Sequence, residues 1–152
     1  MSSIEQTFIP YHAETRLGRG RMLVFAPHPD DEVLGCGGAI LSHVAAGESV
    51  RVIIATDGAF GAADATAYAE TRQMESRAAA AVLGYGEPEF WGLPDRGLHA
   101  DEALAQRVAA ALAAYAPALV LAPSWWEIHP DHTALSLAVT EAVRRSASGI
   151  HL

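Results

Sequence analysis

The sequence predicts an α/β fold with a Rossmann-like, mostly parallel sheet and helices on both of its faces. Two observations support this prediction. Short apolar runs alternate along the chain with longer segments of helical periodicity, a pattern typical of parallel strands joined by helical crossovers. The composition, 51% apolar and 18% charged over 152 residues, suits one folded domain with one core.

Four apolar runs are short enough to form buried strands. The first is stopped by Pro27, the second is rich in β-branched residues, and the fourth is soon followed by Pro123. We therefore expect strands at 22–26, 50–55, 89–91 and 118–121.

Four helices are expected between and after these strands. Gly47 and Gly84 suit the ends of the first two, Pro117 stops the third, and basic residues close the fourth. The expected helices span 33–46, 69–83, 99–115 and 131–145. Because ligands of such folds bind beyond the carboxyl ends of the strands, we look for functional residues in the loops that follow them.

The composition argues against several classes of partner. Ten basic residues against 18 acidic ones give a net charge of −8, so we expect no nucleic-acid partner. Cys36 is the single cysteine, which excludes an intrachain disulfide. No segment approaches the roughly 18 consecutive apolar residues of a membrane span, and the first 21 residues lack the apolar region of a signal peptide. We expect no membrane span and a cytoplasmic location.

Two histidine motifs follow expected strands and begin expected helices. The first reads HPDDE over residues 28–32, and the second reads HPDH over residues 129–132. Proline and acidic residues are ordinary at a helix start, so helix capping explains them. Capping does not explain three histidines, and the two motifs together favour a metal site over two separate caps.

The chemistry of these residues suits a catalytic metal. The positive end of a helix dipole favours neutral imidazole, which is the form that binds metal. A set of two histidines and an aspartate, with one position left for water, suits zinc, and Fe²⁺, Ni²⁺ or Mn²⁺ are alternatives. Water bound to zinc has a pKa of roughly 7, which would provide a nucleophile at neutral pH.

With both motifs unaltered and in this order, the chain resembles the PIG-L (LmbE-like) de-N-acetylase family. Its members are zinc hydrolases that remove acetyl groups from N-acetylglucosamine conjugates, so the resemblance implies a small-molecule amino-sugar conjugate as substrate. It covers about residues 22 to 145. Beyond the motifs it extends to 33–38, 56–58, Arg72 with Glu75 and 83–84, and 92–98.

The resemblance implies a role for each motif residue. His28, Asp31 and His132 would hold the metal, and Asp30 would be the general base that takes the proton of the attacking water. The alternative for Asp30 is a helix N-cap. Glu32 is interpreted as a structural acid in the first turn of the helix.

Four further residues are candidates on the substrate side. His129 would face the oxyanion as a cationic imidazole or protonate the leaving amine, and its alternative is a surface histidine. Asp131 would orient His129 or a metal ligand, or be an ordinary acid of a first helical turn. Arg72 would hold a substrate hydroxyl or phosphate, or belong to a solvated helix face. Asp95 is a weaker candidate for substrate binding.

We expect a deacetylase domain over residues 22–152 after an N-terminal arm over residues 1–21. Family members usually continue well beyond the second motif, so the C-terminal part of the family fold is expected to be absent from this chain. A neighbouring subunit in a homo-oligomer, or a missing segment, would then complete the sugar pocket. The alternative function is a non-catalytic metal-binding module or accessory subunit.

Overall fold

The computed structural model describes residues 17–146 and 150–152, so most of the expected N-terminal arm lies outside the described residues. Its centre is a four-stranded sheet in which every strand pairing is parallel, which confirms the predicted fold class. The strand order is β3-β2-β1-β4. The strands span Met22–Ala26 (β1), Val50–Thr56 (β2), Glu89–Leu93 (β3) and Leu119–Leu121 (β4).

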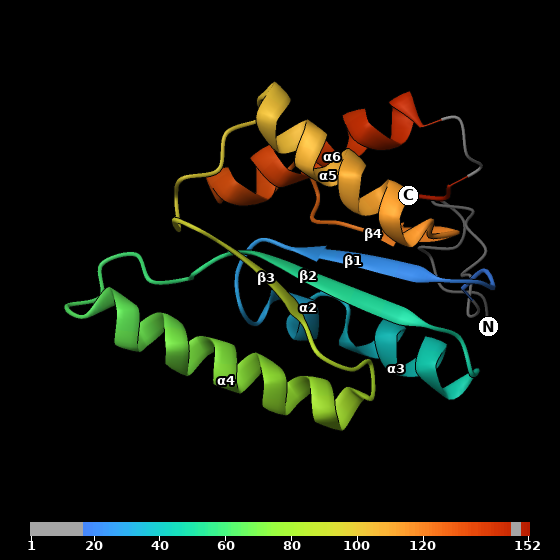
Figure 1. Cartoon of the computed structure of the whole chain (residues 1–152), viewed down its shortest axis with the longest axis horizontal. Helices are drawn as coiled ribbons and strands as arrows, with labels where there is room; N and C mark the ends of the chain where they lie inside the picture. Colours follow the sequence, from blue (N-terminus) through green and yellow to red (C-terminus); the bar gives the residue numbers. More distant parts are fainter. Residues whose placement is uncertain (1–16, 147–149) are drawn as a thin grey trace, which may run out of the picture.

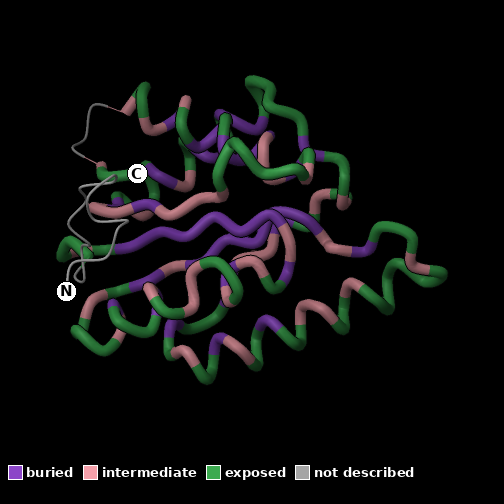
Figure 2. The backbone as a smooth tube through the Cα atoms, turned by 180° about the vertical axis from the view of Figure 1, so that it is seen from behind, coloured by how far each residue is buried: buried purple, intermediate pink, exposed green. Residues whose placement is uncertain are grey.

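Helices cover both faces of the sheet, as predicted (Figure 1). One face carries α2, α3 and α4, and the opposite face carries α5 and α6. Figure 2 shows that β1 and β2 are almost continuously buried, whereas much of each helix is exposed or only partly buried. The helices span Asp31–Leu34 (α2), Gly37–Ala45 (α3), Ala65–Leu83 (α4), Glu102–Tyr115 (α5) and Pro130–Arg145 (α6).

The core consists of two apolar clusters, one on each face of the sheet. Alternate side chains of β1 enter opposite clusters: Leu23 and Phe25 pack with residues of α5 and α6, whereas Met22 and Val24 pack with residues of α3 and α4. All five residues of β1 are buried. This explains why the strand is a continuous apolar run instead of an alternating one.

Three of the expected helices differ clearly from the helices of the structure. The helix expected over 33–46 is divided into α2 and α3, because the glycines around Cys36 have low helix propensity. Helix α4 begins four residues earlier than expected, where the Asp64 side chain accepts a hydrogen bond from the Ala67 N–H. Helix α5 begins at Glu102 instead of residue 99, because the side chain of Asp101 caps it.

The order of the strands fixes where a ligand can bind. The connections from β1 to β2 and β3 run to one side of β1, and β4 lies on its other side. Neighbouring β1 and β4 therefore form the point where the direction of winding changes, and such a point opens a crevice at the carboxyl ends of the strands. Among the described residues, no helix is long and apolar enough to cross a membrane.

Replacing Leu135 of α6 with alanine is expected to lower the free energy of unfolding by about 2–5 kcal/mol. Leu135 is fully buried in the cluster beneath α5 and α6. Leu137 on the same helix is 43% exposed, so Leu137→Ala is the matched control and should change stability by less than about 1 kcal/mol. Urea denaturation of the metal-free chain measures both values, and equal effects would contradict this description of the core.

Candidate metal centre

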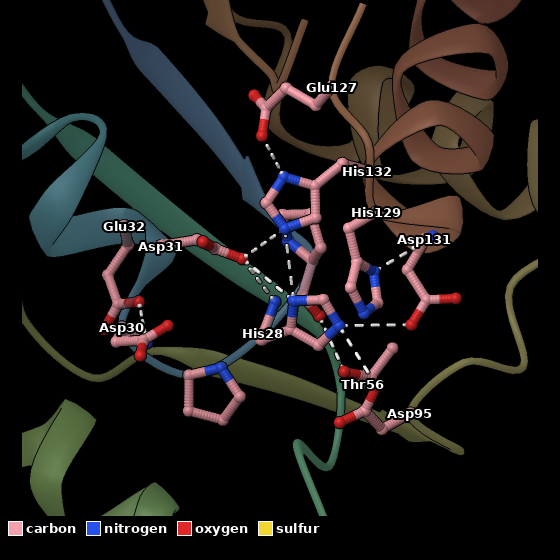
Figure 3. A network of polar contacts seen from close by, with 12 residues as sticks. His28, Asp30, Asp31, Glu32, Thr56, Asp95, Glu127, His129, Asp131 and His132 are labelled. Atoms are coloured by element: carbon pink, nitrogen blue, oxygen red, sulfur yellow. Dashed lines mark hydrogen bonds and ion pairs between the residues drawn. The ribbon is translucent and has the colours of Figure 1, made fainter. Parts of the chain in front are cut away.

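The two histidine motifs meet at the carboxyl ends of β1 and β4 (Figure 3). The first motif follows β1 and leads into α2, and the second lies at the start of α6. The parallel pairing of β1 with β4 brings these loops together, although they are about a hundred residues apart in sequence. The His28 and His132 rings lie 5.2 Å apart between their centroids.

The three predicted metal ligands present their donor atoms as a nearly equilateral triangle. Asp31 Oδ2 is 3.1 Å from His28 Nδ1 and 3.1 Å from His132 Nε2, and the two nitrogens are 3.3 Å apart. Zinc held tetrahedrally at about 2.0–2.1 Å would keep its ligand atoms about 3.3–3.4 Å apart. The spacing and the chemistry of these donors therefore fit one tetrahedral ion with a position left open.

The described residues offer two further groups of donor atoms around the same imidazole. One consists of ring nitrogens of His28, His129 and His132, and the other combines His28 and His129 with Asp95 and Asp131. The atoms of each group lie within 4.8 Å of one another, a looser criterion than the 3.1–3.3 Å of the triangle. The triangle therefore fits a metal better than either group.

Asp131 is fully buried, and its carboxylate is already engaged. Oδ2 accepts the Arg96 N–H at 2.7 Å and lies 3.1 Å from His28 Nε2, while Oδ1 accepts the Leu98 N–H at 3.1 Å. These contacts suit a group that orients His28 and the 96–98 loop. Of the two partners that the sequence left open for Asp131, its carboxylate contacts His28 and not His129.

His28 and Asp31 shift each other's pKa in opposite directions. Burial acts to lower the pKa of His28, but hydrogen bonds with Asp31 and Asp131 outweigh it and raise the pKa above its ordinary value. Burial acts to raise the pKa of Asp31, but its contact with His28 and the charge of His132 lower the pKa overall. A metal would replace the proton that this pair otherwise shares.

His129 occupies the N-cap position of α6, and its ring packs edge-on against His28, 4.5 Å between centroids. Its Nδ1 accepts the Asp131 N–H at 3.3 Å, so a proton on the neutral ring belongs on Nε2. Burial, then the charges of His28 and His132, lower the pKa of His129. This contact and the lowered pKa favour a neutral imidazole with its proton on Nε2, and the cationic role that the resemblance implies stays a prediction.

Asp30 precedes α2 in a strained conformation, with φ of 127°. Only glycine adopts such a φ readily, and the strain costs on the order of 1–3 kcal/mol. The carboxylate makes no capping hydrogen bond and instead contacts Arg72 Nη2 at 2.9 Å. Helix capping therefore does not explain why an aspartate stands at this position. In Figure 3 its carboxylate lies beside Glu32, apart from the donor triangle.

Arg72 projects from α4 toward the first motif instead of into solvent. Its guanidinium donates to the Pro29 carbonyl and to Asp30, lies 3.4 Å from Glu75, and stands 5.9 Å from the centre of the Tyr68 ring. Its side chain is only 19% exposed. These contacts contradict the solvated-face alternative, and substrate binding by Arg72 stays a prediction.

Asp95 lies on the opposite side of His28 from the donor triangle. Its Oδ1 is 3.3 Å from His28 Nε2, but that nitrogen has one proton and Asp131 is nearer at 3.1 Å. Oδ1 is therefore a buried acceptor without a hydrogen-bond donor among the described residues. Such an acceptor suits a substrate hydroxyl or amide, because leaving it unpaired is costly.

Asp57 and Gly58 hold the surrounding loops together. Asp57 Oδ1 accepts the N–H groups of Ala59 and Asp95 at 3.0 and 3.1 Å. Gly58 has φ of 64°, and a Cβ placed there would lie 2.9 Å from Pro29 Cδ. The resemblance over 56–58 therefore has a structural reason, since these residues position the loops that carry the first motif and Asp95.

The sequence analysis did not identify Glu127 as part of this region. Its Oε2 lies 2.5 Å from His132 Nδ1, on the side of the ring away from the donor triangle. Glu127 stands outside both motifs, in the loop between β4 and α6. An acid two residues before the second motif was the available signal, but sequence alone does not show which ring nitrogen it faces.

A crevice of about 390 Å³ opens between α2 and the loop after β4. Its lining includes Asp31, Glu127 and His132, together with apolar or small residues such as Leu34 and Ala122. It lies between the carboxyl ends of β1 and β4, where the strand order predicts a ligand site. Two of the three proposed ligands, Asp31 and His132, therefore face a crevice that can admit a small molecule.

Comparison with known proteins identifies the family to which this fold and this site belong. Residues 23–143 match the model of the PIG-L family, described as GlcNAc-PI de-N-acetylase. The chain belongs to the PIG-L family. The match contains both histidine motifs and every element from β1 to most of α6, so it confirms the resemblance inferred from the sequence.

Individual relatives agree with this assignment. The chain is 33% identical over 156 residues to a 1D-myo-inositol 2-acetamido-2-deoxy-alpha-D-glucopyranoside deacetylase of a Mycobacterium species, covering 83% of this chain and 51% of the relative. It is 30% identical to the N,N'-diacetylchitobiose deacetylase of Pyrococcus horikoshii complexed with its inhibitor MPG. That structure superposes with a TM-score of 0.77 over 82% of this chain and 49% of the other.

A third similar protein, also of known structure, is named for a different reaction. GalB of Pseudomonas putida, a 4-carboxy-2-hydroxymuconate hydratase, is 27% identical, with a TM-score of 0.74 over 81% of this chain and 55% of that chain. The fold is therefore shared by deacetylases and a hydratase. The chain also spans about half the length of the curated relatives that it matches.

Proposed function

We propose that this PIG-L chain is a metal-dependent hydrolase that removes an N-acetyl or other N-acyl group from an amino-sugar conjugate. The observation that carries the proposal is the triangle of His28 Nδ1, Asp31 Oδ2 and His132 Nε2, with sides of 3.1–3.3 Å. Its one carboxylate and two imidazoles are a donor set of catalytic zinc. Zinc is the proposed ion, and Fe²⁺, Ni²⁺ or Mn²⁺ would also suit these ligands.

A metal held by these three residues would polarise the amide carbonyl and lower the pKa of a bound water to about 7. Asp31 supplies the negative charge of the ligand set, and Asp131 orients His28 through Nε2, where the two atoms are 3.1 Å apart. Orientation of this kind fixes the ring and its tautomer. His28 would then present Nδ1 to the metal with Nε2 protonated.

Asp30 takes the proton of the attacking water in this proposal. The residue directly precedes a metal ligand, and its strained φ of 127° indicates a position retained for function. Its carboxylate now contacts Arg72, and catalytic contacts are often longer before substrate binds. Substrate that engages Arg72 would free this carboxylate for proton transfer.

His129 stabilises the oxyanion that forms when water attacks the amide carbonyl. Its Nδ1 is occupied by the Asp131 N–H, so Nε2–H is the donor available to the developing charge. A neutral imidazole at a helix N-terminus can polarise a carbonyl in this way. The leaving amine would take the proton that Asp30 received from water, because a neutral imidazole cannot give up its Nε2 proton without becoming an anion.

We propose the amino-sugar substrate because two similar proteins are deacetylases of amino sugars and because two polar side chains, Asp95 and Arg72, lie beside the first histidine motif. Asp95 Oδ1 is a buried acceptor that lacks a donor among the described residues, and it would accept a hydrogen bond from a sugar hydroxyl. Arg72 would donate to a hydroxyl or phosphate of the aglycone. In both roles the side chain would bind the sugar or the aglycone of the substrate, and not its acyl group.

The test is elemental analysis of the purified chain combined with an amine-release assay on N-acyl glucosamine conjugates. We expect about one metal ion per chain, with amine release that a chelator abolishes and zinc restores. A metal-loaded chain that releases no amine from any N-acyl sugar would overturn the hydrolase proposal. That outcome would favour the alternative, a non-catalytic metal-binding module or accessory subunit, which the half-length match to the curated relatives motivates.

A further inference from the structure

Glu127 contacts Nδ1 of His132, the ring nitrogen that points away from the donor triangle. His132 Nε2 lies 3.1 Å from Asp31 Oδ2, and Nδ1 on the other side of the ring lies 2.5 Å from Glu127 Oε2. A carboxylate accepts hydrogen bonds and cannot donate one when ionised. The proton of a neutral His132 therefore belongs on Nδ1, which leaves the lone pair of Nε2 directed at the other two donor atoms.

The arrangement around His132 mirrors the arrangement around His28. Each imidazole presents one nitrogen to the donor triangle and the other to a carboxylate, Asp131 for His28 at 3.1 Å and Glu127 for His132 at 2.5 Å. The two acids have different origins, because Asp131 is a buried residue of the second motif whereas Glu127 belongs to the loop before it. Paired carboxylates behind two histidines are a typical support for a metal site.

The loop itself holds Glu127 in place. Its other carboxylate oxygen, Oε1, accepts the Ser124 N–H at 3.2 Å. Its main-chain carbonyl accepts a hydrogen bond from Thr133 Oγ1 at 3.1 Å, next to His132 on α6. The side chain is 42% exposed. These contacts fix the acid relative to the first turn of α6.

We propose that Glu127 is a positioning residue that orients His132 for metal binding through Nδ1 and thereby sets the metal affinity of the chain. This inference rests on the metal site of the proposed function. Glu127 is not a ligand here, because its oxygen faces Nδ1 while Nε2 of the same ring faces the triangle. Its loss leaves all three donors present but allows the His132 ring to rotate or change tautomer.

The experiment compares Glu127→Ala and Glu127→Gln with the unmodified chain, using zinc competition against a chromophoric chelator. Loss of an orienting partner typically weakens metal affinity about 10- to 100-fold, and we expect this for Glu127→Ala. Glu127→Gln should lose less, because its amide oxygen can still accept the Nδ1 proton. The visible absorption spectrum of bound Co²⁺ should change in Glu127→Ala and stay near that of the unmodified chain in Glu127→Gln.

Glu102→Gln is the matched control. It removes the same charge from an acid that pairs with Arg145, the last residue of α6, at the opposite end of the helix from His132. Its zinc affinity and Co²⁺ spectrum should equal those of the unmodified chain. Urea denaturation of the metal-free variants checks that each one folds.

Two outcomes would overturn the inference. If Glu127→Ala binds zinc within about twofold of the unmodified chain, Glu127 does not position His132. If it loses zinc as completely as a variant without His132, Glu127 is itself a ligand. Both outcomes are read from metal binding alone, so they are separate from a failure of the proposed function, in which the metal-loaded unmodified chain releases no amine.

Discussion

Replacing Asp30 with asparagine is expected to leave the metal in place and to lower kcat by about 10²- to 10⁴-fold, the usual contribution of a general base. Asparagine is the suitable substitution because it tolerates a positive φ better than most residues, and Asp30 has φ of 127°. Its amide oxygen can also keep the contact with Arg72 that now measures 2.9 Å. The variant therefore removes the base without removing the local structure.

Zinc content and the rate of amine release, measured on the same preparation, test this prediction. Glu75→Gln is the control, because Glu75 also lies near Arg72, at 3.4 Å, yet its side chain is 66% exposed on α4. It should keep kcat within about threefold of the unmodified chain. If Asp30→Asn kept more than about a tenth of the activity, Asp30 would not be the base. Loss of zinc would instead assign it to metal binding.

Replacing His132 with alanine is expected to abolish stoichiometric metal binding and, with it, turnover. The substitution removes one of three donor atoms, and the remaining pair, His28 Nδ1 and Asp31 Oδ2, is 3.1 Å apart and lies within the first motif. Catalytic zinc sites ordinarily use three protein ligands. The loss of affinity should therefore exceed the roughly 10- to 100-fold effect of removing an orienting partner.

Elemental analysis after dialysis measures this loss directly. His99→Ala is the control, because His99 is an exposed imidazole outside every group of donor atoms described here. It should keep about one metal per chain. His132→Ala chains that still bound zinc with the affinity of the unmodified chain would remove His132 from the ligand set. The remaining candidate would then be the group of His28, His129, Asp95 and Asp131.

The elements of the fold follow from local sequence. The run Met22–Ala26 is apolar throughout because both faces of the central strand are covered. Gly84 ends α4 in the left-handed conformation that glycine adopts most easily. The helix expected over 33–46 is the clearest difference, because apolar periodicity continues across Gly35 while the backbone turns there from α2 into α3. The spacing of apolar residues alone does not show that the helix is interrupted there.

The sequence by itself determined the α/β fold class, the family resemblance and the residue types of the two histidine motifs. These depend on local pattern and on the order of motifs, both of which are written along the chain. Tertiary structure decided which atoms meet: that the Asp131 carboxylate contacts the ring of His28, that Asp30 contacts Arg72 instead of capping α2, and that Glu127 contacts His132. The physical reason is that hydrogen bonds act over about 3 Å between specific atoms. The pairing of β1 with β4 brings the Asp131 carboxylate to His28, and the packing of α4 brings Arg72 to Asp30. Glu127 meets His132 where the loop turns into the first turn of α6, a conformation that local sequence does not specify.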